Sequence, residues 1–75
     1  MFKNGRGVAQ DYAEAVRLWR LAAAQGFAVA QVNLGFMFEN GRGVAQDRAE
    51  AVRLYRLAAA QGRAHATQAL QRLGA

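Results

Sequence analysis

The chain has 75 residues, with ten lysines and arginines against five acidic residues and no cysteine or proline. This length allows one small domain that buries only about 60–65% of its unfolded surface, and the absence of cysteine excludes disulfides and thiolate metal sites. The net charge of +5 favours acidic partners, and no segment resembles a membrane span or secretory signal, so we expect a soluble and by default cytoplasmic chain.

The sequence repeats itself with an offset of 36 residues. The octapeptide NGRGVAQD at residues 4–11 returns unchanged at residues 40–47. From Asn4 to Gly26, only two of 23 positions differ from their counterparts 36 residues later. Such a period is typical of stacked helical repeats.

We therefore predict a single domain, residues 1–75, built from two repeat units, residues 4–39 and 40–75. Residues 1–3 precede the first unit, and Met1 and Phe2 align with Met37 and Phe38 of the helix before the second unit. We interpret them as the remnant of a preceding helix.

Each octapeptide has two glycines around an arginine, which could form either a phosphate cradle or a structural corner. A dinucleotide fingerprint needs a preceding strand and a third glycine, and the flanks here are helical. An aspartate at the following helix start would also repel an anion. We predict structural corners containing Gly5, Gly7, Gly41 and Gly43, with Val44 packing into the core.

Residues 11–26 follow the first corner and predict a helix with both ends marked. Asp11 and Glu14 have the spacing of a capping box, and Gly26 is a left-handed stop. Residues 47–62 repeat this pattern. In both helices a narrow face of alanines carries one aromatic residue, Trp19 in the first and Tyr55 in the second.

Two further helices are predicted at residues 27–40 and 63–74. The core stripe of the first contains Ala30, Leu34, Met37 and Phe38, and that of the second contains Ala66, Leu70 and Leu73. The predicted fold is all-α: an α/α superhelical solenoid of antiparallel helix pairs.

The motifs of residues 28–66 closely resemble the Sel-one-like repeat, a relative of the tetratricopeptide repeat. The matching positions are Leu34-Gly35, Phe38, Gly41-x-Gly43-Val44, Asp47, Ala51, Tyr55, Ala58-Ala59 and Gly62. The resemblance implies a scaffold for protein–protein contacts, with bacterial members in signalling, envelope or host-interaction roles. One disulfide-rich branch is linked to β-lactam binding or hydrolysis, and this chain lacks its cysteines.

The side-chain inventory argues against catalysis. There is no serine or cysteine, and a lone histidine, His65, falls short of the three or four donors that a metal needs. The capping boxes occupy four of the five carboxylates and leave Glu39 without an acidic partner. We expect no enzyme activity, no metal and no cofactor.

A second stripe on the helix at residues 27–40 is distinct from its core stripe and predicts a partner-binding groove. Phe36 and Val32 would form an apolar patch with a polar and cationic fringe. Packing between these residues or against another chain is the alternative. The predicted groove residues are Val29, Val32, Phe36, Glu39, Asn40, His65, Gln68 and Arg72.

The two ends of the repeat differ. At the C-terminal end, Gln71 and Arg72 replace Gly35 and Phe36, so we expect the stack to stop there. The N-terminal end lacks a covering helix, which predicts a homodimer, by exchange of helices or otherwise. The predicted interface residues are Phe2, Tyr12, Val16 and Trp19. A fragment of a longer array is the alternative.

Polyanion or nucleic-acid binding is the alternative function. Its ridge would comprise Arg17, Arg20, Arg53 and Arg56, which repeat at the same offset. Glu14 and Glu50 precede two of these arginines by three residues, a spacing that favours local ion pairs. We therefore regard nucleic acid as the less favoured partner and a protein or peptide as the more favoured one.

Overall fold

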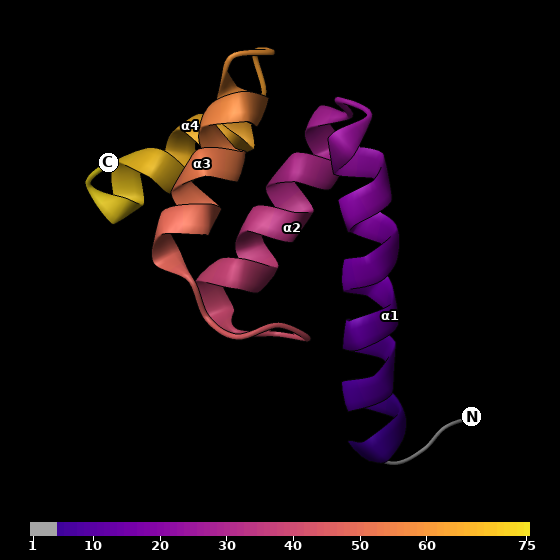
Figure 1. Cartoon of the computed structure of the whole chain (residues 1–75). Coiled ribbons are helices and arrows are strands. Elements are labelled where there is room, and N and C mark those ends of the chain that lie inside the picture. Colours follow the sequence, from indigo (N-terminus) through magenta and orange to yellow (C-terminus); the bar gives the residue numbers. More distant parts are fainter. Residues whose placement is uncertain (1–4) are drawn as a thin grey trace.

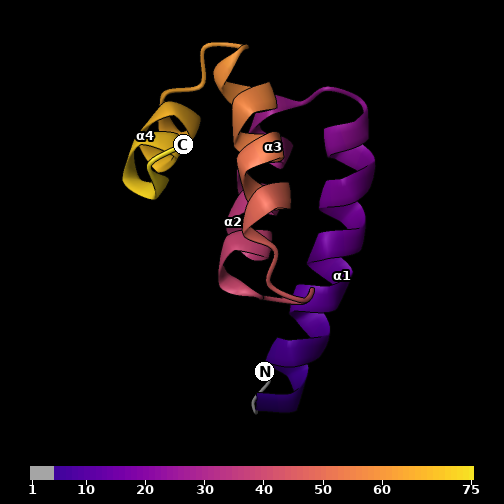
Figure 2. The same cartoon turned by 60° about the vertical axis from the view of Figure 1, so that its left-hand side comes forward.

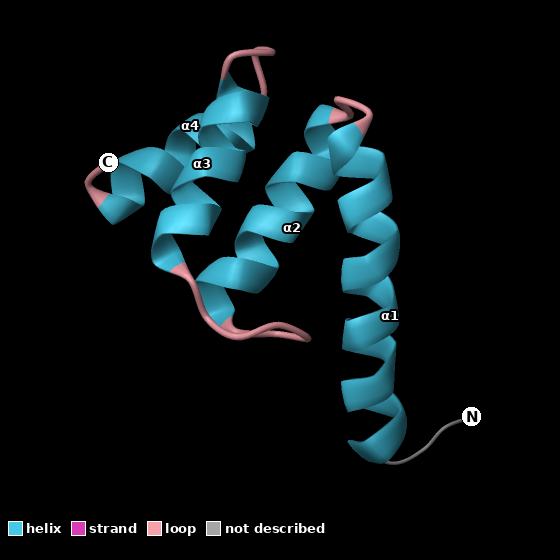
Figure 3. Ribbon diagram, in the orientation of Figure 1, coloured by secondary structure: helices cyan, strands magenta, loops and turns pink. Residues whose placement is uncertain are grey.

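The computed structural model describes residues 5–75, with side chains from Tyr12 onward. This part of the chain contains four helices and no strand (Figure 3): α1 (Gly5–Ala24), α2 (Ala28–Asn40), α3 (Arg48–Ala59) and α4 (Ala64–Leu73). Each helix folds back on the one before it and packs mainly against its neighbours in sequence (Figure 1). Figure 2 shows α1 and α4 on opposite sides of the stack, with α2 and α3 between them. The predicted all-α solenoid is confirmed.

The core lies where α2 and α3 meet. Small side chains allow this close approach: Ala51 and Ala58 of α3 are 0% exposed. A Cβ atom on Gly35 would lie 2.9 Å from the ring of Tyr55, so the two helices touch at this glycine. The buried apolar side chains are Val16, Ala23, Ala30, Leu34, Phe38, Ala51, Leu54, Tyr55, Ala58, Ala66 and Ala69. The predicted core stripes of α2 and α4 contribute to it, with Met37, Leu70 and Leu73 partly buried against it.

The second octapeptide forms the predicted corner between α2 and α3. Gly41 and Gly43 have φ angles of 68° and 75°, and Val44 packs against the core. The Asp47 carboxylate caps α3 by accepting a hydrogen bond from the Glu50 amide at 3.1 Å. The reciprocal half of the capping box does not form, because the Asp47 amide donates to the Phe38 carbonyl at 2.9 Å.

The first octapeptide does not form a corner, and that prediction is wrong. Helix α1 begins at Gly5 and runs through Gly7 and Asp11, so Asp11 lies inside the helix rather than at its N-cap. In the second copy, hydrogen bonds to the preceding helix α2 and packing against α1 hold the corner. In the first copy, residues 5–11 instead form the first turns of α1.

Candidate functional site

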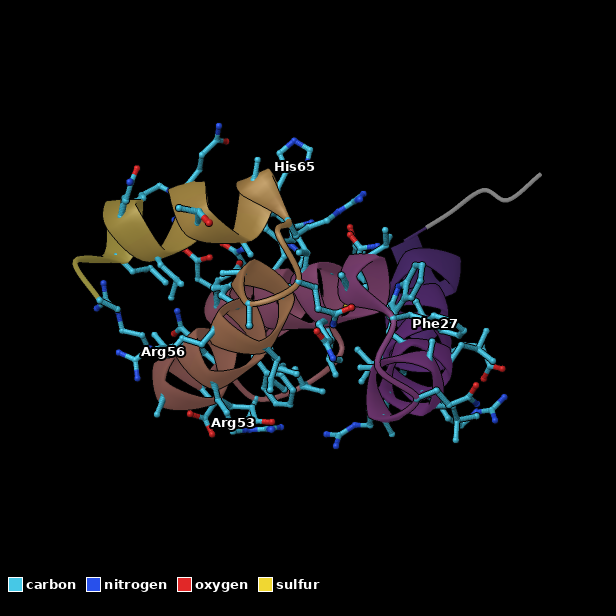
Figure 4. The ribbon with its side chains drawn as sticks, turned by 90° about the horizontal axis from the view of Figure 1, so that it is seen from above. Phe27, Arg53, Arg56 and His65 are labelled. Atoms are coloured by element: carbon cyan, nitrogen blue, oxygen red, sulfur yellow. The ribbon has the colours of Figure 1, made fainter. Side chains whose placement is uncertain are left out.

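A groove of about 350 Å³ lies between α2 and α4, with the ring of Tyr55 at its base. The side chain of Phe36 is 50% exposed here, which is unusual for a large aromatic residue. His65 lies at the start of α4 on the upper side of the view in Figure 4. The lining residues are Val32, Asn33, Phe36, Tyr55, His65, Ala69 and Arg72.

The structure brings together four of the eight predicted groove residues: Val32, Phe36, His65 and Arg72. Helix α4 is inclined to α2 (Figure 1), and the other four predicted positions do not line this groove. Glu39 and Asn40 line a separate hollow at the C-terminal end of α2, together with Gln46, Arg48 and Leu73. Val29 and Gln68 are exposed and do not line the groove.

Three helices meet at the carboxylate of Glu39. The Tyr55 hydroxyl of α3 donates to Glu39 Oε1 at 2.8 Å. The Arg72 guanidinium of α4 donates to the same oxygen at 3.1 Å and also bonds Oε2. This network holds α4 against the α2–α3 pair and fixes Arg72 at the edge of the groove.

The network changes the acidity of its members. The hydrogen bonds from Arg72 lower the pKa of Glu39 below its ordinary value, and burial of the carboxylate opposes them only in part. Burial raises the pKa of Tyr55, and the hydrogen bond to Glu39 raises it further. The tyrosine is therefore a donor and the carboxylate an acceptor at neutral pH.

Glu39→Gln should lower the free energy of unfolding at pH 7 by about 1 kcal/mol, a figure reduced by solvent at the exposed Arg72. Because the pKa of Glu39 in the native state is lower than its unfolded value near 4.5, the ionised carboxylate stabilises the fold above that pH. This stabilisation is lost as the pH falls through the native pKa. The difference in the free energy of unfolding between wild type and Glu39→Gln should therefore shrink as the pH is lowered below about 5. Urea unfolding at each pH would measure this difference. Glu14→Gln, at an exposed pair with Arg17, is the control and should cost less. Parallel pH profiles for wild type and Glu39→Gln would contradict the role assigned to Glu39.

The outer face of α1 is open. Ala15, Leu18, Trp19 and Ala22 border an apolar groove of about 380 Å³. The side chain of Leu18 is 52% exposed, whereas Leu54, its counterpart in α3, is 2% exposed. Helix α3 packs against both α2 and α4, whereas α2 is the main helix that α1 contacts among the described residues. Leu18 is left exposed on α1, while Trp19 and Ala22 are partly buried against the core.

The predicted self-association residues that the structure describes lie in different environments. Trp19 lies on the open face. Val16 is 4% exposed and belongs to the core, because the corner at Gly43 packs against it, so its prediction as an interface residue is wrong. Tyr12 accepts a hydrogen bond from Arg42 at 2.8 Å and so fastens the corner to α1. Phe2 falls outside the described residues.

The arginine ridge is partly neutralised. Arg53 donates to Glu50 at 2.9 Å, and Arg17 pairs with Glu14, as the spacing predicts. The guanidinium of Arg20 lies 5.4 Å from the centre of the Phe38 ring. Figure 4 shows Arg53 and Arg56 at the periphery of α3, away from His65. The ridge thus offers less free positive charge than four arginines suggest.

Among the residues that the structure describes, no group of three or more histidine, aspartate and glutamate side chains could hold a metal ion. None of the helices in this part of the chain has the length and apolar character needed to cross a membrane.

Comparison with protein families finds one match that accounts for most of the chain. The Sel1 repeat model matches residues 1–27 and again residues 28–62. The second match contains α2, the corner and α3. No curated protein and no solved structure matches the sequence.

Proposed function

The chain belongs to the Sel1 repeat family, and from this premise we propose that it is a non-enzymatic module that binds a protein or peptide partner. Sel1 repeats are generally protein–protein interaction modules. The observation that supports the proposal here is the groove between α2 and α4, where Phe36 is half exposed beside Val32.

The composition of the groove favours a peptide with an apolar anchor. Phe36, Val32 and Ala69 supply apolar surface, while Asn33, His65 and Arg72 offer polar contacts around it. Aromatic residues in concave, partly desolvated positions contribute most to protein interfaces. Arg72 is held by Glu39 and is therefore oriented before a partner arrives.

Phe36→Ala should weaken peptide binding by about tenfold or more without changing the melting curve, because its side chain is half exposed. Peptides selected from a random display library on the immobilised chain would be titrated against wild type and variant by calorimetry. Phe27→Ala is the matched control: its ring is 58% exposed and lies beside α1, away from His65 (Figure 4). Equal affinities for all three proteins would remove the groove as the binding site.

The same titration, repeated at two salt concentrations, distinguishes peptide binding in the groove from the alternative function. Binding of a polyanion through Arg17, Arg20, Arg53 and Arg56 should fall steeply with salt, whereas an apolar groove should respond little. The ion pairs of Arg17 and Arg53 favour the groove.

We also propose that the chain self-associates through the open face of α1. The support is the apolar groove at Leu18 and Trp19, whose counterpart in α3 is buried. An uncovered apolar face of this kind is a common site of association.

A further inference from the structure

A second hollow, of about 470 Å³, lies next to the groove at the C-terminal end of α2. The ion pair between Glu39 and Arg72 separates the two depressions, because Arg72 lines the groove and Glu39 lines the hollow. The two depressions therefore meet at this ion pair, and they differ in character. Four of the five residues that line the hollow are polar or charged: Glu39, Asn40, Gln46 and Arg48, beside Leu73.

Both depressions lie along the same side of α2. Phe36 lines the groove and Asn40 lines the hollow. These two residues are about one helical turn apart, which corresponds to a rise of about 6 Å. An extended peptide advances about 3.3 Å per residue, and its alternate side chains point to the same side. A peptide with an apolar side chain against Phe36 would therefore bring the side chain two positions away to the hollow.

The hollow has more positive than negative charge around it. Arg48 and Arg72 both act on the single carboxylate of Glu39. Arg72 forms an ion pair with this carboxylate, whereas none of the ion pairs among the described residues includes the exposed Arg48. Asp47 precedes Arg48, but its carboxylate caps α3 and does not line the hollow. The three groups around the Glu39 carboxylate therefore sum to one positive charge.

Two carboxamide side chains of the hollow are held by the end of α2. Gln46 donates to the Glu39 carbonyl at 2.7 Å, and Asn40 donates to the Phe36 carbonyl at 2.9 Å. Each carboxamide also has an oxygen that can accept a hydrogen bond from a peptide N–H group. Because both side chains are oriented before a peptide arrives, less conformational entropy is lost on binding. The hollow is thus suited to a polar stretch of extended chain that carries a negative side chain.

We infer that the peptide partner of the groove carries an aspartate or glutamate two positions from its apolar anchor, and that this carboxylate binds in the hollow beside Arg48. The guanidinium of arginine presents its N–H groups in a fork that matches a carboxylate. A side chain supplies the carboxylate, because it is the alternation of side chains that carries it from the groove to the hollow. The inference rests on the proposed binding function and specifies the chemistry of its partner.

Selection of peptides on the immobilised chain tests the inference directly. The probe is a display library of random peptides with constant residues on both sides, so that no free C-terminus is presented. Wild type should enrich a large apolar residue with an acidic residue two positions away. Arg48→Glu should still enrich the apolar residue, but with lysine or arginine in place of the acid. Arg56→Glu is the matched control: it makes the same change in net charge at an exposed arginine of α3 outside the hollow, and it should select the same peptides as wild type.

The affinity of one selected peptide gives a second measurement. Replacing its acidic residue by the corresponding amide should weaken binding by about threefold, and Arg48→Gln should have a similar effect, as expected for an exposed ion pair. The two changes combined should weaken binding no more than either one alone. Arg56→Gln should bind the peptide as wild type does. Calorimetry would measure the four affinities, and thermal unfolding would verify that both variants are folded.

Two results would overturn the inference while leaving the proposed binding function intact. One is the selection of apolar peptides with no acidic residue at this spacing, or with an acidic preference that survives Arg48→Glu. The other is an acidic preference that falls equally in the Arg48 and Arg56 variants, which would reflect the net charge of the chain. Selected peptides whose affinity does not depend on Phe36 would instead contradict the proposed function, and the inference with it.

Discussion

Gly43→Ala is expected to lower the free energy of unfolding by about 3 kcal/mol or more, a large part of the stability of a domain of this size. Two effects add. The backbone at Gly43 has a φ of 75°, which costs a residue with a Cβ atom about 1 kcal/mol. The added Cβ would also lie 2.6 Å from the carbonyl oxygen of Tyr12, and neither backbone can yield without separating the corner from α1.

Gly62→Ala separates these two effects. Gly62 has a φ of 84°, and a Cβ atom placed there meets nothing within 4 Å. This variant should therefore show only the conformational cost, about 1 kcal/mol. Urea unfolding of both variants gives the comparison. Equal losses would mean that the approach of Gly43 to α1 has no energetic importance.

Gly7→Ala should have the opposite effect on the free energy of unfolding. Gly7 occupies the position of Gly43 in an identical octapeptide, but its backbone is helical. Alanine there should raise stability by about 0.5–1 kcal/mol, since glycine is the poorer helix former. A loss comparable to that of Gly43→Ala would indicate that the first octapeptide forms a corner in solution.

This pair of glycines also marks a limit of sequence-based prediction. The four helices, the second corner and the Asp47 cap follow from local signals that each repeat carries. No local signal distinguishes residues 4–11 from residues 40–47, because their sequences are identical. Only the helix packed before the second copy decides the difference, and that is a tertiary contact.

Four of the seven residues that line the candidate groove were also predictable, and the limit there is geometric. The spacing of Val32 and Phe36 places them on one side of a helix, but the inclination of α4 decides which positions meet it. The contact between Glu39 and Arg72 joins residues 33 apart in sequence and depends on that inclination. Gln31 is a similar case. It is buried and donates to the Ala23 carbonyl at 3.3 Å, although its residue type suggests a surface position.

Tyr55→Ala should be the most destabilising of the substitutions considered, with a loss of about 3–5 kcal/mol. The side chain is 1% exposed and fills the contact between α2 and α3, so its removal leaves a cavity and removes one of the two hydrogen bonds to Glu39 Oε1. A domain of this length has a total stability of roughly 4–11 kcal/mol, so much of the population could unfold at 37 °C. Circular dichroism with thermal and urea unfolding would measure the loss.

Two further variants show how much of that loss comes from the hydrogen bond and how much from the packing of the ring. Tyr55→Phe keeps the ring and removes the hydrogen bond to Glu39, which should cost about 1 kcal/mol. Trp19→Ala removes the larger ring from the matching position of the first repeat, but that ring lies on an open face and is only partly buried. Measured at a concentration where the chain is monomeric, it should cost less than about 2 kcal/mol despite the greater volume lost. A loss equal to that of Tyr55→Ala would mean that the Trp19 ring is as fully packed as that of Tyr55, and the proposed self-association through it would then be wrong.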